Sequence, residues 1–227
     1  MTKTINVFPP HGWVSLESHS GTDLDVVNAA KVSFAKHSNE FGESESGVLR
    51  FLMRERHGSP FEHNYFKFHV RAPIFVIREW QRHRIGCSYN EESGRYVELR
   101  PDFYIPEASR VQEGKPGAYT FAEGTDTQTK QVKISVAMIN DTSFAAYQTM
   151  IKAGVAKEQA RIVLPLNIYS EFYFTCNARS LMNFLSLRMD GSAMYEIYKY
   201  AEAMFNLWEM VMPETAQAFM EYGRSAP

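Results

Sequence analysis

Residues 82–96 read RHRIGCSYNEESGRY, and this stretch is the most informative part of the chain. Charged and polar side chains crowd around one strongly apolar residue, Ile85. Unpaired charges are too costly to bury, so the stretch is not a core element. It is either a solvated loop or a site for a ligand with several negative charges. Arg82 and Arg84 can offer forked donors to phosphate, and Asn90 and Ser93 can recognise sugars or bases.

The composition is that of an ordinary globular protein. The 227 residues are 44% hydrophobic and 22% charged, and the net charge is −2. Such a balance argues against sequence-independent binding to nucleic acid, so phosphate must be recognised by local arginines. Cys87 and Cys176 form no CxxC pair, which suggests a reducing compartment. The first residues lack the apolar run of a signal peptide, and we expect a soluble, cytoplasmic, single-domain protein.

The chain before this stretch predicts short strands and helices. Pro9–Pro10 and Gly12 divide residues 4–18 into two strands, and Thr22 with Asp25 forms a capping box for a helix that runs to about residue 34. After a polar loop at 36–46, we expect a helix at 47–56. Alternating polarity then predicts a half-buried strand at 64–71. Pro73 suits the first turn of the helix that leads into residue 82.

The chain after this stretch predicts a helix-rich half. Residues 107–129 are rich in Gly, Thr, Glu and Gln, which indicates a variable surface insert or a break between two lobes. A long amphipathic helix at 131–153 should end at Gly154. A strand at 166–176 and helices at 178–189 and 192–212 follow. We therefore predict an α+β fold with a central, mostly antiparallel sheet flanked by helices.

Two further polar clusters carry possible chemistry. In HGSPFEH, at residues 57–63, His57 and His63 lack a third matched ligand, and the chain contains no HExxH motif. We therefore predict no metal, and interpret the cluster as a cofactor-contacting turn or a capped junction. In the segment 160–188, Asn177 can cap a helix whose N-terminus, with Arg179, would form an anion site. The alternative for this segment is a helix with surface arginines.

These motifs together resemble the flavin-dependent thymidylate synthases. The signature of that family is RHR, a short polar spacer and a serine, matched here by Arg82 to Arg84 and Ser93. The segments HGSPFEH, APIFVIREW, SGRY, PDFYIP, ARIVLPLN and NARSLMNFL also look like family segments, in the order of the family. The resemblance extends over nearly the whole chain, from about Asp23 to Tyr222. Their joint occurrence is far more specific than any one motif.

The chain departs from the family pattern at three places. The spacer at residues 85–92 has eight residues, where the family usually has seven. Glu79 stands where glutamine is frequent, and a carboxylate accepts hydrogen bonds but does not donate them unless it is protonated. Ser192 stands where some relatives have histidine.

The resemblance implies reductive methylation of dUMP to dTMP, with 5,10-methylenetetrahydrofolate as carbon donor, FAD as hydride source and NADPH as reductant. It also implies a homotetramer whose subunits share each active site. Carried over by position, the FAD contacts would be His57, Ser59, Arg82, His83, Arg84, Glu91, Asn177, Arg179 and Asn183. The nucleotide contacts would be Glu79, Trp80, Gln81, Arg82, Glu91, Glu92, Ser93, Gly94, Arg95, Arg161 and Arg188.

Arg188 is the residue that we expect to act in catalysis. Carbon 5 of uracil becomes nucleophilic when negative charge on N3 and O4 is stabilised, and a fixed cation serves that purpose. Ser93 lacks a general base at reliable spacing, so we do not assign it as a nucleophile, nor Cys87. Two alternatives stay open. One is flavin- and folate-dependent modification of another pyrimidine nucleotide, and the other is a nucleotide- or RNA-binding module built on residues 82–95 and 64–70.

Overall fold

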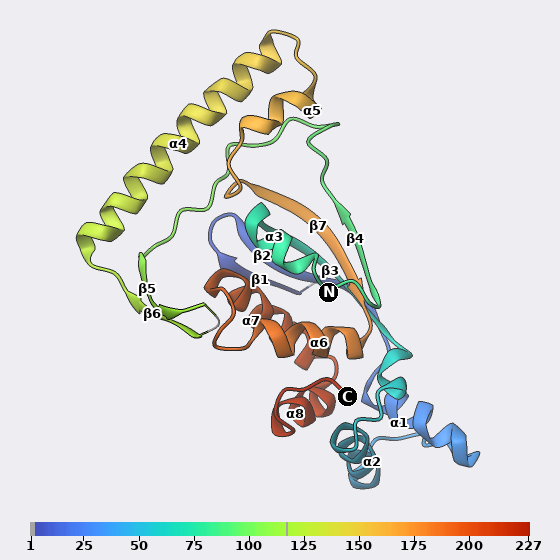
Figure 1. Cartoon of the computed structure of the whole chain (residues 1–227). Coiled ribbons are helices and arrows are strands. Elements are labelled where there is room, and N and C mark those ends of the chain that lie inside the picture. Colours follow the sequence, from blue (N-terminus) through green and yellow to red (C-terminus); the bar gives the residue numbers. More distant parts are fainter. Residues whose placement is uncertain (1–2, 117) are drawn as a thin grey trace. The chain divides into compact units, whose positions relative to one another are not determined.

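The computed structural model describes residues 3–116 and 118–227, which form an α+β fold (Figure 1). The described residues group into two compact units. The first contains the chain up to Val70 together with Glu79–Asn90 and Phe172–Pro227. The second contains Arg71–Arg78 and Glu91–Glu171.

A five-stranded antiparallel sheet supplies strands to both units. Its order is β1-β2-β3-β7-β4. The two N-terminal strands pair antiparallel with Ile5 opposite Val14, and the break at Pro9–Pro10 between them confirms the predicted turn. The strand bounds are β1 Lys3–Phe8, β2 Gly12–Ser20, β3 Tyr65–Pro73, β4 Cys87–Glu91 and β7 Tyr169–Cys176.

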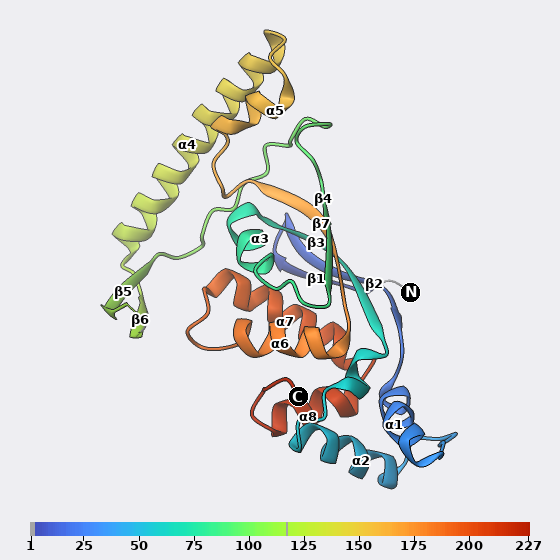
Figure 2. The same cartoon turned by 45° about the vertical axis from the view of Figure 1, so that its right-hand side comes forward.

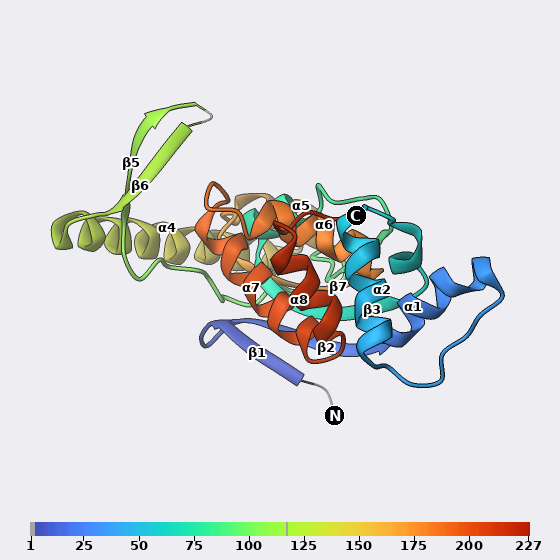
Figure 3. The same cartoon turned by 90° about the horizontal axis from the view of Figure 1, so that it is seen from below.

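The core of the first unit is built on aromatic side chains. The indole of Trp80 is fully buried, with its centroid 4.9 Å from the ring of Phe184 and 5.8 Å from that of Phe174. Edge-to-face and tilted ring pairs of this kind add to the free energy of burial. Helices α6 (Ala178–Arg188) and α7 (Tyr195–Glu209) lie side by side in Figure 2. The final helix, α8 (Pro213–Glu221), packs against α7 and α2 (Glu43–Arg54), as Figure 3 shows.

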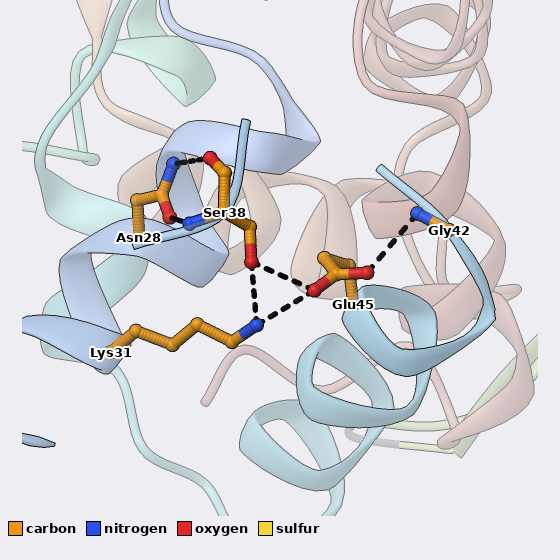
Figure 4. Close-up of polar contacts among 5 residues, drawn as sticks. All are labelled: Asn28, Lys31, Ser38, Gly42 and Glu45. Atoms are coloured by element: carbon orange, nitrogen blue, oxygen red, sulfur yellow. Dashed lines mark hydrogen bonds and ion pairs between the residues drawn. The ribbon is translucent and has the colours of Figure 1, made fainter. Parts of the chain in front are cut away.

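A polar network fixes the loop between α1 (Asp23–Lys31) and α2. The Lys31 amine lies 2.7 Å from both the Ser38 hydroxyl and the Glu45 carboxylate, and Ser38 donates to the same carboxylate at 2.8 Å (Figure 4). The Asn28 side-chain amide donates to the backbone carbonyl of Ser38 at 3.0 Å and accepts from its backbone N–H at 2.8 Å. The other Glu45 oxygen accepts from the backbone of Gly42. The loop is therefore held at its middle and at its end.

The start of α2 corrects one prediction. The helix begins at Glu43, not at residue 47, because Gly42 and Glu45 form its N-terminal cap. The capping box at Thr22 is confirmed at the start of α1, which is followed by the 3₁₀ turn η1 (Val32–Phe34). Pro73 ends β3 rather than opening the helix, and α3 runs from Ile74 to Trp80.

The second unit contains the long helix and a hairpin. Residues 110–123 form β5 (Arg110–Lys115) paired antiparallel with β6 (Ala118–Glu123), inside the stretch predicted as an insert. Helix α4 runs from Asp126 to Lys152, five residues longer at its start than predicted, because Thr125 caps it through the backbone N–H of Gln128. Gly154 ends this region with a φ of +82°, as predicted. The short α5 (Lys157–Ala160) and η3 (Arg161–Val163) follow.

Some elements escaped prediction for physical reasons. Strand β4 lies within residues 82–96, at the edge of the sheet. An edge strand can pair through its backbone alone, so it needs no alternation of apolar side chains, and the sequence therefore carries no strand signal here. The last helix follows α7 after a break at Met210–Met212, which the run of apolar residues concealed. The short η2 (Ser59–Glu62) lies within the HGSPFEH cluster.

Candidate active site

A cavity of about 550 Å³ lies in the first unit, between the end of α3, the turn that carries RHR, and helix α6. Three of its side chains are arginines and one is a glutamate, so its walls favour an anionic ligand. Its lining residues are Glu79, Arg82, His83, Arg84, Ile85, Cys87, Ser180, Asn183, Leu187, Arg188, Ser192 and Ala193.

The RHR turn is held in place by two hydroxyl groups. The single O–H proton of Tyr89, on β4, is shared between the backbone carbonyls of His83 at 2.7 Å and Trp80 at 3.0 Å. The Ser180 hydroxyl, on α6, donates to the carbonyl of Ile85 at 2.9 Å. These bonds join the turn to an edge strand on one side and a helix on the other.

A glycine permits this close approach. Gly86 has a φ of +67°, in the left-handed region that favours glycine. A Cβ atom there would lie 2.3 Å from the Ser180 oxygen, well inside contact distance. The eight-residue spacer therefore contains a tight turn at Gly86.

Helix α6 carries several cavity residues because its start is fixed. Asn177 caps it by accepting from the backbone N–H of Ser180 at 2.8 Å, which confirms the predicted cap. Asn183 lines the cavity as an exposed amide. The N-terminal turn of this helix adds partial positive charge near Ser180.

Arg188 is fixed by three hydrogen bonds at the base of the cavity. Its Nε donates to Nε2 of His83 at 2.9 Å. One terminal nitrogen donates to the Glu79 carboxylate at 2.8 Å, and the other to the Glu79 backbone carbonyl at 3.0 Å. The Arg188 side chain is 15% exposed, so the guanidinium has little freedom to reorient. Arg188 is one of the residues that line the cavity, and its role in catalysis stays a prediction.

His83 is neutral near pH 7 in this environment. Burial, followed by the charges of Arg188 and Arg82, lowers its pKa to about 4. Its Nε2 accepts from Arg188, so the proton of the neutral ring is on Nδ1. The ring packs edge-on against Phe184, with 4.9 Å between centroids. Arg82 and Arg84 flank it as exposed cations.

Cys87 also lines the cavity, where sequence reasoning had set it aside. Burial raises the pKa of its thiol to about 11, so the thiolate nucleophile is scarce at neutral pH. Ser180 and Leu187 were missed as well, although their spacing from Asn183 along a helix would place them on one face. Among residues 3–116 and 118–227, no three His, Cys, Asp or Glu side chains gather as a metal site would require.

Several predicted site residues of the first unit lie outside this cavity. The Nε of Arg179 donates to the Pro227 carbonyl at 2.7 Å, and Arg179 also pairs with Glu62. His57 lies edge-on to Phe51, and Ser59 is exposed at the start of η2. Three more lie outside it: Asn177 caps α6, Gln81 is exposed, and Trp80 is buried. The Trp80 ring is fully buried among aromatic side chains, and its predicted place in the nucleotide site stays a prediction.

The other predicted nucleotide contacts form a turn in the second unit. The Glu92 backbone N–H donates to the carbonyl of Glu171 at 2.8 Å, and the Ser93 hydroxyl accepts from the backbone of Arg95 at 3.3 Å. Gly94 is buried against Arg161, whose Cδ would lie 3.2 Å from an added Cβ. The structure thus brings together five of the predicted residues, namely Glu92, Ser93, Gly94, Arg95 and Arg161, while Glu91 is exposed at the end of β4.

The chain matches a known family over most of its length. The family model described as "Thymidylate synthase complementing protein" matches residues 15–214. A flavin-dependent thymidylate synthase of Streptomyces coelicolor is 49% identical, over 94% of this chain and 93% of that protein. The chain belongs to the flavin-dependent thymidylate synthases. Another such enzyme, from Tropheryma whipplei, is 48% identical over 94% of both chains.

Solved structures agree with this membership of the flavin-dependent thymidylate synthase family. The UMP/dUMP methylase PolB from Streptomyces cacaoi, bound with 5-Br dUMP, superposes with a TM-score of 0.88 at 45% identity. The match covers 94% of this chain and 97% of PolB. The predicted family and the predicted α+β fold with an antiparallel sheet are therefore confirmed. In the part of the chain that the structure describes, none of the helices is both long and apolar enough to span a membrane.

Proposed function

We propose that this flavin-dependent thymidylate synthase converts dUMP to dTMP, with 5,10-methylenetetrahydrofolate as carbon donor and NADPH as reductant. The observation that carries the proposal is the Arg188 guanidinium, held by three hydrogen bonds in a cavity rich in arginine. The names of the relatives support the same reaction. FAD, when bound, supplies the hydride that completes the methyl group.

The donor set of the cavity suits FAD and a nucleotide monophosphate, since both carry phosphate. Arg82 and Arg84 are exposed on the cavity wall, and a guanidinium binds phosphate with two parallel hydrogen bonds. Asn183 adds an amide that can both donate and accept. We assign the flavin side to these residues with His57, Ser59, His83, Glu91, Asn177 and Arg179.

Arg188 is the group that would stabilise charge on the nucleotide base. A guanidinium has five N–H donors, and three of the Arg188 donors are used by His83 and Glu79. One N–H remains on each terminal nitrogen. A cation that is already fixed before the reaction needs no reorganisation when negative charge develops on the ring. The nucleotide side would further include Gln81, Glu92, Ser93, Gly94, Arg95 and Arg161.

The test of this function is tritium release from 5-tritiated dUMP under low oxygen. Release that depends on FAD, NADPH and methylenetetrahydrofolate, with formation of dTMP, is the expected result. Release that persists without the folate, or no release from flavin-bound protein supplied with all three, would contradict the proposal.

UMP is a second candidate substrate. PolB, the UMP/dUMP methylase, was also solved with 5-Br UMP, and that structure superposes on the whole of this chain with a TM-score of 0.87 at 43% identity. Parallel assays with UMP and dUMP distinguish the two, because a ribose-tolerant site would methylate both.

We also propose that the whole chain acts as one functional unit in a cytoplasmic homotetramer with shared active sites. Light scattering of the purified protein should then give four times the chain mass of 26.1 kDa. Mixing inactive variants altered at Arg188 and at Arg161 should restore activity if different subunits supply these residues to one site. A monomer with full activity would contradict this assembly.

A further inference from the structure

Glu79 contacts Arg188 in a way that has a consequence for base recognition. One carboxylate oxygen, Oε2, accepts from a terminal nitrogen of Arg188 at 2.8 Å, and the Glu79 backbone carbonyl accepts from the other terminal nitrogen at 3.0 Å. Glu79 therefore accepts hydrogen bonds from both terminal nitrogens of the guanidinium, one through its side chain and one through its backbone. Its side chain is 38% exposed, and it is itself part of the cavity wall.

The second carboxylate oxygen of Glu79 is available to a ligand. Among the described residues, Oε1 has no hydrogen-bond partner, while Arg188 keeps one unused N–H on each terminal nitrogen. The pair thus offers one acceptor beside two donors. A ring edge that carries a donor next to an acceptor complements this pattern, and the N3–H and O4 of uracil form such an edge.

We propose that Glu79 is a specificity-determining residue that selects bases with an N3–H, such as uracil. This inference rests on the proposed function. Oε1 accepts the N3–H, while the ion pair holds Arg188 beside O4. Cytosine has an unprotonated N3 at the equivalent place, and its lone pair would face a carboxylate that can only accept. Two acceptors without a proton between them repel, so the cytosine nucleotide binds more weakly.

The variant Glu79→Gln separates this role from simple support of Arg188. A guanidinium has no acceptor, so the amide oxygen of the glutamine must face Arg188. The NH₂ group then points where Oε1 was. The substitution keeps the hydrogen bond to Arg188 but replaces an acceptor with a donor on the ligand side. A donor at that point suits N3 of cytosine and opposes the N3–H of uracil.

The experiment is calorimetric titration of the FAD-loaded protein with dUMP and with dCMP. The wild type should bind dUMP at least about tenfold more tightly, the size of one hydrogen bond to a charged group. In Glu79→Gln the ratio of dissociation constants should fall about tenfold or invert. Glu202→Gln is the matched control, because it removes a carboxylate from a different ion pair of the first unit, the one between Glu202 and Lys199 on α7. That variant should keep the wild-type ratio.

Two results would overturn the inference. One is an unchanged dUMP-to-dCMP ratio in Glu79→Gln, and the other is an equal loss for both nucleotides, which indicates support of Arg188 alone. A thermal melt of each variant shows that it is folded. A different result would contradict the proposed function. If the wild type binds dUMP more tightly than dCMP but releases no tritium from dUMP, the proposed reaction is wrong and the role of Glu79 in base selection stands. Turnover of dUMP with no change of ratio would contradict only the role of Glu79.

Discussion

Arg188 and His83 form a hydrogen bond in which the arginine Nε donates to the histidine Nε2 at 2.9 Å. The bond requires a neutral imidazole, because a doubly protonated ring has no acceptor. Since burial and neighbouring cations lower the pKa of His83 to about 4, the ring keeps its lone pair at neutral pH. The histidine of the RHR signature thus orients the Arg188 guanidinium, to which we assign the catalytic role.

Replacing Arg188 should damage turnover far more than replacing Ser93. We expect Arg188→Ala to lower kcat by about 10²–10³, the loss typical of one preorganised electrostatic group. Ser93→Ala should keep measurable turnover, because Ser93 is not assigned as a nucleophile. The measurement is the rate of tritium release at saturating dUMP for both variants. Equal losses in the two would reject this division of roles.

Protonation of His83 should weaken the fold in mild acid. Its folded pKa of about 4 lies below the ordinary value of 6.5, so between these values the unfolded chain binds the extra proton. Stability from this group is complete above about pH 6.5 and falls as the pH drops toward 4, by up to about 3 kcal/mol. Urea unfolding at pH 7 and pH 4.5 measures the fall. His83→Gln, whose amide oxygen can still accept from Arg188, should lose less stability over this range. An identical fall in the variant would show that other groups cause it.

The sequence was sufficient for elements with regular periodicity and for motifs with local causes. The capping box at Thr22, the cap at Asn177 and the glycine end of the long helix at Gly154 were all predicted, because each depends on residues within one turn. The polar stretch 82–96, singled out by its composition, contributes Arg82, His83, Arg84, Ile85 and Cys87 to the lining of the candidate cavity. These features are local in the chain.

Contacts between residues far apart in the sequence could not be predicted. Glu79 and Arg188 are 109 positions apart, and only the folded chain brings the carboxylate to the guanidinium. The same holds for Ser180 and Ile85, which join α6 to the RHR turn. The burial of Trp80 was not predicted for a similar reason, since its neighbours in sequence are polar while its neighbours in space are aromatic. Periodicity shows which face of an element is apolar, but it does not show what packs against that face.

Gly86→Ala should destabilise the protein and disturb the cavity. The backbone φ of +67° is strained for alanine, and the new Cβ would meet the Ser180 oxygen at 2.3 Å. A cost of about 1–3 kcal/mol is typical of such strain. Gly47→Ala is the matched control, since Gly47 lies inside α2 with open space around a Cβ, and it should stabilise by about 0.5–1 kcal/mol. Urea unfolding measures the change in the free energy of unfolding for each variant, which should be a loss for Gly86→Ala and a gain for Gly47→Ala. A Gly86→Ala variant as stable as the wild type would contradict the tight turn.

The Lys31–Ser38–Glu45 network should contribute stability that disappears in strong acid. Hydrogen bonds from Lys31 and then Ser38 lower the pKa of Glu45 to about 2. A carboxyl group with a depressed folded pKa stabilises the fold above its ordinary value of 4.5, and this stability is lost as the pH falls through 2. Glu45→Gln should therefore lower Tm at pH 7, and the difference from wild type should shrink between pH 4.5 and 2. Glu55→Gln, in an exposed pair with Arg54, should leave Tm nearly unchanged. A Tm difference for Glu45→Gln that stays constant down to pH 2 would show that the ionised carboxylate is not what holds the loop.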